Sequence, residues 1–171
     1  MEIIGIIGAM DSEVRDLCEQ LQNKKCIDYA GLKYFSGTLG GKDVIVVKSG
    51  IGKVNAALCA QAMILKFGAT KIINTGIAGA LGSGLGVFDF VVSTFAVYHD
   101  FDTTAFGYKL GQVPGMEEQF PADKTLVNAA ITAFKNTDFS KEHKIVQGLV
   151  ASGDQFISAG EKKNFIKENF N

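Results

Sequence analysis

Glu13 is the residue whose place in the sequence points most directly to chemistry. An apolar run over residues 2–8 is typical of a buried strand, and a helical pattern begins at Asp11. Glu13 therefore follows a strand and opens a helix, the place where open parallel sheets bind ligands. A helix N-terminus favours an ionised carboxylate, which suits a general base. The ordinary alternative is a first-turn glutamate that only interacts with the helix dipole.

A second candidate is the glycine-rich stretch that follows the strand pattern at residues 71–76. Such turns often bring backbone N–H groups to a phosphate. The spacing matches neither the dinucleotide fingerprint nor the P-loop motif. Phosphate sites favour arginine, yet the only arginine, Arg15, is far from these turns in sequence, and Lys48 and Lys53 flank a different turn. A bound phosphate therefore has little support, and tight turns with close packing explain the glycines equally well.

His99, Asp100 and Asp102 raise the possibility of a metal site. They stand together at the end of a strand pattern, without a matching cluster elsewhere in the sequence. We expect no metal and a hydrogen-bonded, structural His99.

Two aromatic segments could contact a ligand or a second subunit. Residues 98–120 form a long stretch without periodicity, rich in apolar and aromatic residues, which is typical of a functional loop. Phe156 and Ile157 follow another strand pattern, where a flat ring could be gripped. A phenylalanine that packs in the core is an equal alternative for Phe156.

The elements that must position these residues alternate between strand and helix. This alternation, with one hairpin at Gly40-Gly41, predicts an α/β fold: a three-layer α/β/α sandwich around a mixed central sheet. Asp11 is the expected N-cap of the first helix. The apolar stripe of the second helix comprises Val54, Ala57, Leu58, Gln61 and Leu65. The predicted strands are 2–8, 33–39, 43–49, 71–76, 87–100 and 144–152, and the predicted helices are 11–22, 52–67, 122–136 and 160–170.

Composition excludes several classes of protein. The 171 residues are 47% hydrophobic, which excludes disorder and allows one domain over residues 1–171. A net charge of -1 without a basic run argues against nucleic acid as the main partner. The three cysteines form an odd set without a Cys-x-x-Cys, which indicates a reducing cytoplasm. The apolar N-terminus is too short for a membrane span and lacks the basic region of a signal peptide.

Five ordered motifs give the sequence a family resemblance. They are GIIGAMDSEV, SGIGKVNAA, INTGIAGAL, YHDFDTTAFGYKLGQVPG and SGDQFI. Together they closely resemble the bacterial 5′-methylthioadenosine/S-adenosylhomocysteine nucleosidases of the nucleoside phosphorylase superfamily. The resemblance implies a nucleoside phosphorylase-like fold, a homodimer and no cofactor. It also implies hydrolysis of the N-glycosidic bond of these small-molecule nucleosides to adenine and a thioribose, in methionine salvage.

The resemblance implies a role for individual residues. Glu13 corresponds to the carboxylate that activates water, Phe156 to the aromatic residue that stacks on adenine, and Ile157 to the residue whose backbone reads the base. The residues implied to line base, sugar and alkylthio group are Met10, Ile51, Ala78 and Gly79, with Phe106, Tyr108 and Pro114 on the loop that reaches the partner subunit.

The sequence also departs from the family pattern. Ile77 stands where the family usually has a serine near the water. Relative to the family the C-terminal part is absent, so we expect residues 1–171 alone to be inactive. The alternatives are a related purine nucleoside phosphorylase, an aminodeoxyfutalosine hydrolase, or an inactive nucleoside-binding fragment.

Overall fold

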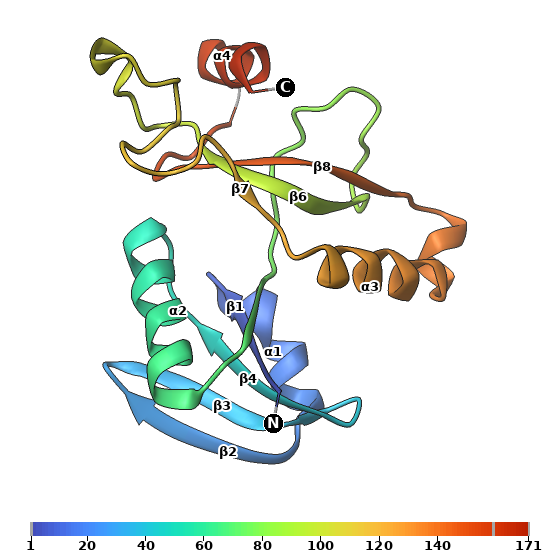
Figure 1. Cartoon of the computed structure of the whole chain (residues 1–171). Helices are drawn as coiled ribbons and strands as arrows, with labels where there is room; N and C mark the ends of the chain where they lie inside the picture. Colours follow the sequence, from blue (N-terminus) through green and yellow to red (C-terminus); the bar gives the residue numbers. More distant parts are fainter. Residues whose placement is uncertain (1, 159, 171) are drawn as a thin grey trace. The chain divides into compact units, whose positions relative to one another are not determined.

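The structure is a computed structural model that describes residues 2–158 and 160–170 (Figure 1). The internal contacts of the chain fall into two compact units, residues 1–78 and residues 79–171. Each unit has its own hydrogen-bonded sheet, and each sheet mixes parallel with antiparallel pairing. The prediction of an α/β fold with mixed strand pairing is therefore confirmed, and the strands form two sheets where one central sheet was predicted.

The sheet of the first unit has the strand order β2-β3-β4-β1-β5. β1 pairs in parallel with both β4 and β5, whereas β3 pairs antiparallel with β2 and β4. The carboxyl ends of β1, β4 and β5 consequently meet at one edge of this sheet. The strands are β1 (Ile3–Gly8), β2 (Gln22–Tyr29), β3 (Leu32–Leu39), β4 (Lys42–Lys48) and β5 (Lys71–Asn74).

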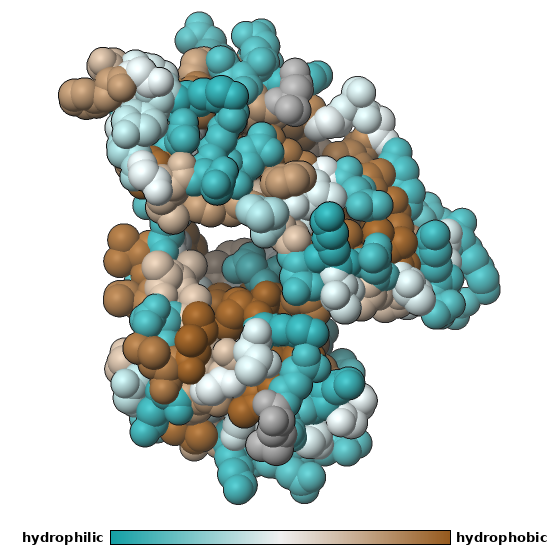
Figure 2. Space-filling view, viewed as in Figure 1, coloured by the Kyte–Doolittle hydropathy of each residue, from teal (hydrophilic) through white to brown (hydrophobic). Residues whose placement is uncertain are grey.

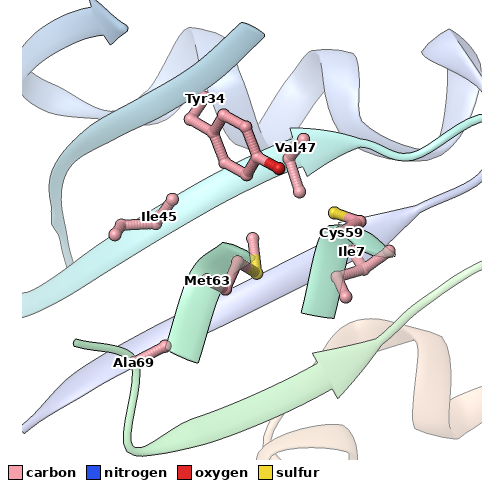
Figure 3. Packing of buried hydrophobic residues seen from close by; sticks show 7 residues of the cluster. All are labelled: Ile7, Tyr34, Ile45, Val47, Cys59, Met63 and Ala69. Carbon is pink, nitrogen blue, oxygen red and sulfur yellow. The ribbon is translucent and has the colours of Figure 1, made fainter. Parts of the chain in front are cut away.

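Helices α1 (Asp11–Gln20) and α2 (Lys53–Phe67) cover opposite faces of this sheet. Ile6 packs in a cluster with Val14 of α1, whereas its neighbour Ile7 packs with Cys59 and Met63 of α2 (Figure 3). Successive residues of a strand point to opposite faces, so these two clusters lie on the two sides of the sheet. The first unit is thus a three-layer α/β/α sandwich, as the alternation of elements predicts.

The predicted hairpin is present between β3 and β4. Gly40 and Gly41 have φ values of 57° and 75°. Two successive positive φ values suit the tight turns whose twist matches that of the strands, and glycine adopts them without a steric penalty.

Three details of the first unit differ from the sequence prediction. Met10, not Asp11, is the N-cap of α1, because the Glu13 side chain returns to the Met10 N–H and fixes Met10 in an extended conformation. β2 was not predicted, because its sequence, QNKKCIDY, is largely polar and exposed. The stripe predicted for α2 is exposed: Val54, Leu58 and Leu65 are 66–76% accessible, and apolar surface gathers over α2 in Figure 2.

The exposed stripe has a physical reason. The face of α2 that meets the sheet carries the buried Cys59 and Met63, flanked by the small residues Ala60 and Ala62. These residues let the helix approach the sheet closely, and the larger aliphatic residues are turned away from it.

The second unit is built on three strands in the order β7-β6-β8. β6 (Phe90–Tyr98) pairs in parallel with β8 (Ile145–Ser152) and antiparallel with the short β7 (Phe120–Pro121). α3 (Lys124–Lys135) packs on β6, where the ring centroids of Phe134 and Phe90 lie 4.9 Å apart. The remaining helical elements are the 3-10 turns Thr104–Phe106 and Asp138–Lys141 and helix α4 (Glu161–Asn169).

The segment between β6 and β7 is a loop with a 3-10 turn and no strand or α-helix, as predicted, and it is held by its own hydrogen bonds. The Gly111 N–H donates to the Phe101 carbonyl at 2.8 Å, and the Thr103 hydroxyl donates to the Gln112 carbonyl at 3.0 Å. Lys109 and Glu118 form an ion pair at 2.6 Å. None of the helices in the described part of the chain is long and apolar enough to cross a membrane.

Candidate active site

The carboxyl edge of β1, β4 and β5 gathers the first group of predicted site residues. The Ser49 N–H donates to the Gly8 carbonyl, and the Thr75 N–H donates to the Ile7 carbonyl, both at 2.9 Å. These bonds join the exits of the three parallel strands. The segments that leave β1 and β5 therefore run side by side, and α1 begins next to them.

Glu13 occupies the centre of this edge. Its Oε2 accepts hydrogen bonds from the N–H groups of Ala9 and Met10 at 2.7 and 2.9 Å. Its Oε1 accepts a hydrogen bond from the Ile77 N–H at 3.1 Å. Three backbone donors thus surround one carboxylate and fix its orientation. A carboxylate held in this way at a strand edge can accept a proton from a bound water.

Tight packing at Gly8 brings α1 close to β1. A Cβ atom at Gly8 would lie 2.6 Å from Val14 Cγ1 and 3.0 Å from Glu13 Cβ. Contacts this short are not tolerated, so only glycine allows Glu13 to approach the end of β1.

The exit of β4 carries charged and polar groups. Lys48, at the end of β4, forms an exposed ion pair with Asp11 at 2.8 Å. The buried Ser49 hydroxyl donates to the Gly50 carbonyl at 2.9 Å. The ion pair links the end of β4 to the start of α1, whereas the Ser49 contact lies within the segment between β4 and α2.

The other predicted site residues of the first unit lie on the same segments. Met10 is half-buried between β1 and α1, and Ile51 is 76% exposed between β4 and α2. The Ile51 carbonyl accepts a hydrogen bond from Asn55 Nδ2 at 2.7 Å. Ala78 is exposed beyond β5. The structure thus brings Met10 into direct contact with Glu13 through the Met10 N–H.

The second unit holds the remaining predicted residues. Phe156 is 95% exposed, so the alternative of a core phenylalanine is wrong for this chain. Gly79 is exposed, as are three residues of the loop: Phe106, Tyr108 and Pro114. Ile157 is half-buried and lines a cleft of about 200 Å³ together with His99, Asp100, Gln155, Lys162, Phe165 and Ile166.

The glycine-rich segment of the second unit is a braced turn. Asp89 accepts hydrogen bonds from the N–H groups of Gly86 and Lys144 at 2.8 and 3.0 Å. These two bonds are the main cause that lowers the pKa of Asp89 below its ordinary value. The Lys144 ammonium also donates to the Gly84 carbonyl. Among the described residues, Lys144 is the lysine that contacts this turn, and its hydrogen bonds stabilise the turn. This favours the tight-turn interpretation of the glycines.

His99 and its acidic neighbours have separate structural partners. Asp102 accepts hydrogen bonds from the N–H and hydroxyl of Thr104 at 2.9 and 2.7 Å, which lower its pKa. Asp100 accepts the Asp154 backbone N–H at 2.8 Å, and the backbone N–H of His99 donates to the Ser152 carbonyl at 2.9 Å. Within residues 2–158 and 160–170, no group of three His, Cys, Asp or Glu side chains is arranged to hold a metal ion.

The donors that hold Glu13 were not predicted from the sequence. Ala9 and Ile77 contribute backbone N–H groups, which carry no signature in the side-chain sequence. The one available signal is Gly76, which stands two residues after the end of β5 and lies against the Glu13 carboxylate.

Comparisons with known proteins agree with this architecture. A family model described as Phosphorylase superfamily matches residues 3–171. A 5′-methylthioadenosine/S-adenosylhomocysteine nucleosidase of Staphylococcus saprophyticus is 45% identical over 168 residues, which cover 98% of this chain and 72% of that protein. The corresponding protein of Anoxybacillus flavithermus is 42% identical, with 98% of this chain and 71% of that protein covered.

Solved structures of nucleosidases share the fold of the chain. The Colwellia psychrerythraea nucleosidase in complex with adenine has a TM-score of 0.94 and 41% identity, and the match covers 99% of this chain and 69% of that one. The Neisseria meningitidis nucleosidase in complex with methylthio-immucillin-A also has a TM-score of 0.94, with 39% identity and coverage of 99% and 72%. This chain therefore belongs to the phosphorylase superfamily and, within it, to the family of 5′-methylthioadenosine/S-adenosylhomocysteine nucleosidases.

Proposed function

We propose that this protein hydrolyses the N-glycosidic bond of 5′-methylthioadenosine and S-adenosylhomocysteine and releases adenine and the thioribose. The observation that carries the proposal is the Glu13 carboxylate, held by the N–H groups of Ala9, Met10 and Ile77 at the carboxyl edge of three parallel strands. The relatives named above, which are nucleosidases and include complexes with adenine and with methylthio-immucillin-A, support this choice of substrate.

In the proposed reaction Glu13 is the general base. Cleavage of a glycosidic bond passes through a sugar with cationic, oxocarbenium-like character. A water molecule bound to the Glu13 carboxylate gives up a proton as its oxygen bonds to the anomeric carbon. The carbon–nitrogen bond breaks, and its electron pair leaves with adenine. A base already fixed by three backbone hydrogen bonds needs little reorganisation during this step.

Adenine and the rest of the substrate need contacts of their own. We assign stacking on adenine to the exposed ring of Phe156, and recognition of the base edge to the backbone of Ile157. Sugar and alkylthio contacts are assigned to Met10, Ile51, Ala78 and Gly79, with Phe106, Tyr108 and Pro114 on the loop between β6 and β7. Cofactors have no role in this scheme.

The direct test is release of adenine from 5′-methylthioadenosine by the wild-type chain and by the Glu13→Gln variant. Turnover by the wild-type chain would contradict the expectation that residues 1–171 alone are inactive. Glutamine keeps the shape of the side chain but cannot accept the proton, so the rate falls by roughly 10²–10⁴-fold. Glu19→Gln, an exposed change on the same helix, is the matched control and leaves the rate unchanged. Adenine release by Glu13→Gln at the wild-type rate would sink the assignment.

Two further measurements distinguish the proposed hydrolysis from the alternative functions. A phosphorylase requires phosphate for turnover, whereas the proposed hydrolase works at the same rate without it. A substrate panel that includes aminodeoxyfutalosine separates the sister activity, since a futalosine hydrolase mutant of Helicobacter pylori has 33% identity and a TM-score of 0.88. Adenine binding without turnover would identify a binding protein instead.

We also propose that the protein is a cytoplasmic homodimer. Its three cysteines are free thiols, which a reducing compartment preserves. The loop between β6 and β7 exposes Phe106 and Tyr108 on a segment ordered by its own hydrogen bonds, which suits an interface with a second copy.

A further inference from the structure

We propose that Gly76 is a positioning residue for Glu13, and that Oε1 of Glu13 is the oxygen that takes the proton from water. This inference rests on the proposed hydrolysis and adds to it the residue that sets the geometry of the base and the atom that reacts.

The hydrogen bonds of Glu13 distinguish its two oxygens. An ionised carboxylate offers about four acceptor positions, two on each oxygen. Oε2 accepts from Ala9 and Met10, so both of its positions are occupied. Oε1 accepts only from Ile77 among the contacts that the structure describes, so one position is left. A water that donates to Glu13 therefore binds at Oε1.

Gly76 sets the place of Oε1. A Cβ atom at Gly76 would lie 2.4 Å from Glu13 Oε1 and 2.8 Å from Glu13 Cδ. Real Cβ contacts are essentially never shorter than 3.0 Å, so alanine at position 76 and the present carboxylate cannot coexist. The atoms in the way are the far end of a flexible side chain, and Gly76 does not have a positive φ. The Gly76→Ala chain can therefore fold normally, with the carboxylate displaced from the Ile77 N–H.

This displacement matters for the chemistry and hardly at all for stability. In the proposed step the water oxygen bonds to the anomeric carbon and one water proton passes to Oε1. The electron pair of the broken carbon–nitrogen bond leaves on adenine, which takes up a proton from bulk water, and Glu13 later returns its proton to bulk water. A displacement of about 1 Å of a reacting group can cost on the order of 10²-fold in rate.

The kinetic test compares Gly76→Ala with Gly82→Ala in the full chain. A Cβ at Gly82 would meet Leu85 Cδ1 at an ordinary 3.5 Å, so this control is expected to keep wild-type kinetics. Gly76→Ala should lower kcat roughly 10- to 100-fold, with KM and melting temperature close to those of the wild type. The double variant Glu13→Gln/Gly76→Ala should be no slower than Glu13→Gln alone, because both changes remove the same base. Multiplied losses would overturn the proposal.

A second measurement does not depend on activity. The amide protons of Ala9, Met10 and Ile77 are followed by NMR in the wild type, in Gly76→Ala and in Gly82→Ala. Because Ile77 directly follows position 76, its amide shift responds to any substitution there, so the amides of Ala9 and Met10 are decisive. Gly76→Ala should shift both, as Glu13→Gln does, and Gly82→Ala should not. Unchanged Ala9 and Met10 amides in Gly76→Ala overturn the positioning role even if hydrolysis is observed. If the wild type releases no adenine, the proposed function fails while the amide shifts still decide whether Gly76 positions Glu13.

Discussion

At the scale of single residues, Glu13 is held by contacts within its own helix start and by one long-range contact. Its place after β1 and at the start of α1 follows from local patterns, and so does its contact with Met10, three positions away. The contact with Ile77 spans 64 positions and exists only because β5 pairs in parallel with β1. Residue identity does not encode a backbone donor, so this contact was not predictable from the site residues alone.

Tyr34 of β3 is a buried polar residue with a different role. Its side chain is completely buried, and its hydroxyl points toward Val47 and Cys59 (Figure 3). Among the described residues the hydroxyl has no hydrogen-bond partner of normal geometry. Burial and, to a smaller extent, the adjacent Cys59 thiol raise the pKa of Tyr34 to about 12.

We expect Tyr34→Phe to be as stable as the wild type at pH 7, or more stable by up to about 1 kcal/mol, because the hydroxyl that is removed is poorly satisfied. The folded state holds the phenol proton more tightly than the unfolded state. The contribution of the protonated Tyr34 phenol to the free energy of unfolding is therefore fully present below pH 10. It is lost between pH 10 and pH 12, by at most about 1.4 kcal/mol per pH unit. The phenylalanine variant lacks this loss, so its advantage grows above pH 10.

Chemical denaturation of both proteins from pH 7 to pH 11 measures this difference. Tyr29→Phe is the matched control, because Tyr29 is 41% exposed and keeps contact with water. A Tyr34→Phe chain that is less stable than the wild type by more than about 1 kcal/mol at pH 7 would mean that the hydroxyl has a good partner in solution.

At the scale of elements, the sequence predicted strands and helices more reliably than the faces they bury. β1, β4 and β5 are short apolar runs rich in β-branched residues and flanked by turns, and their length and composition favour a strand over a helix. β2 lies at the edge of the sheet and pairs only with β3, so its polar sequence carries no alternation. α2 has apolar residues on several sides, and periodicity alone could not tell which side meets the sheet.

The braced turn before β6 provides a test at this scale. Asp89 joins the glycine-rich segment to the start of β8 through the N–H groups of Gly86 and Lys144. Asp89→Ala should lower the melting temperature at pH 7. Because the pKa of Asp89 is lowered in the folded state, its contribution is present above the ordinary pKa of an aspartate and disappears as the pH falls through the lowered pKa. The wild type and the variant should therefore converge in acid.

Thermal melts from pH 2 to pH 7 follow this convergence. Asp138→Ala removes an ion pair in which the Asp138 side chain is 94% exposed, and it should change the melting temperature less than Asp89→Ala at every pH. Equal effects of the two changes would show that Asp89 does not brace the turn.

At the scale of the whole molecule, family membership spans both compact units, because the family model matches residues 3–171. We expect residues 1–171 to unfold cooperatively as one domain, although the internal contacts fall into two compact units. One unfolding transition, seen at the same denaturant concentration by probes in both units, is the expected result.

Association into a homodimer is the remaining expectation at this scale, with the loop between β6 and β7 at the interface. Phe106 is 80% exposed and Tyr108 is 37% exposed, and aromatic residues dominate interface hot spots. Hydrogen bonds within the loop order it before binding, which lowers the entropy lost on association.

Sedimentation should therefore give a dimer at micromolar concentration. Tyr108→Ala should weaken the dimer by about 2 kcal/mol, which is roughly 30-fold in Kd. Tyr29→Ala, a tyrosine of similar exposure in the first unit, should leave the Kd unchanged. A wild-type chain that sediments as a monomer at micromolar concentration would rule out the dimer. If Tyr108→Ala leaves the Kd of the dimer unchanged, the interface does not include this loop. Removal of an anchoring ring from an interface causes a measurable loss of affinity.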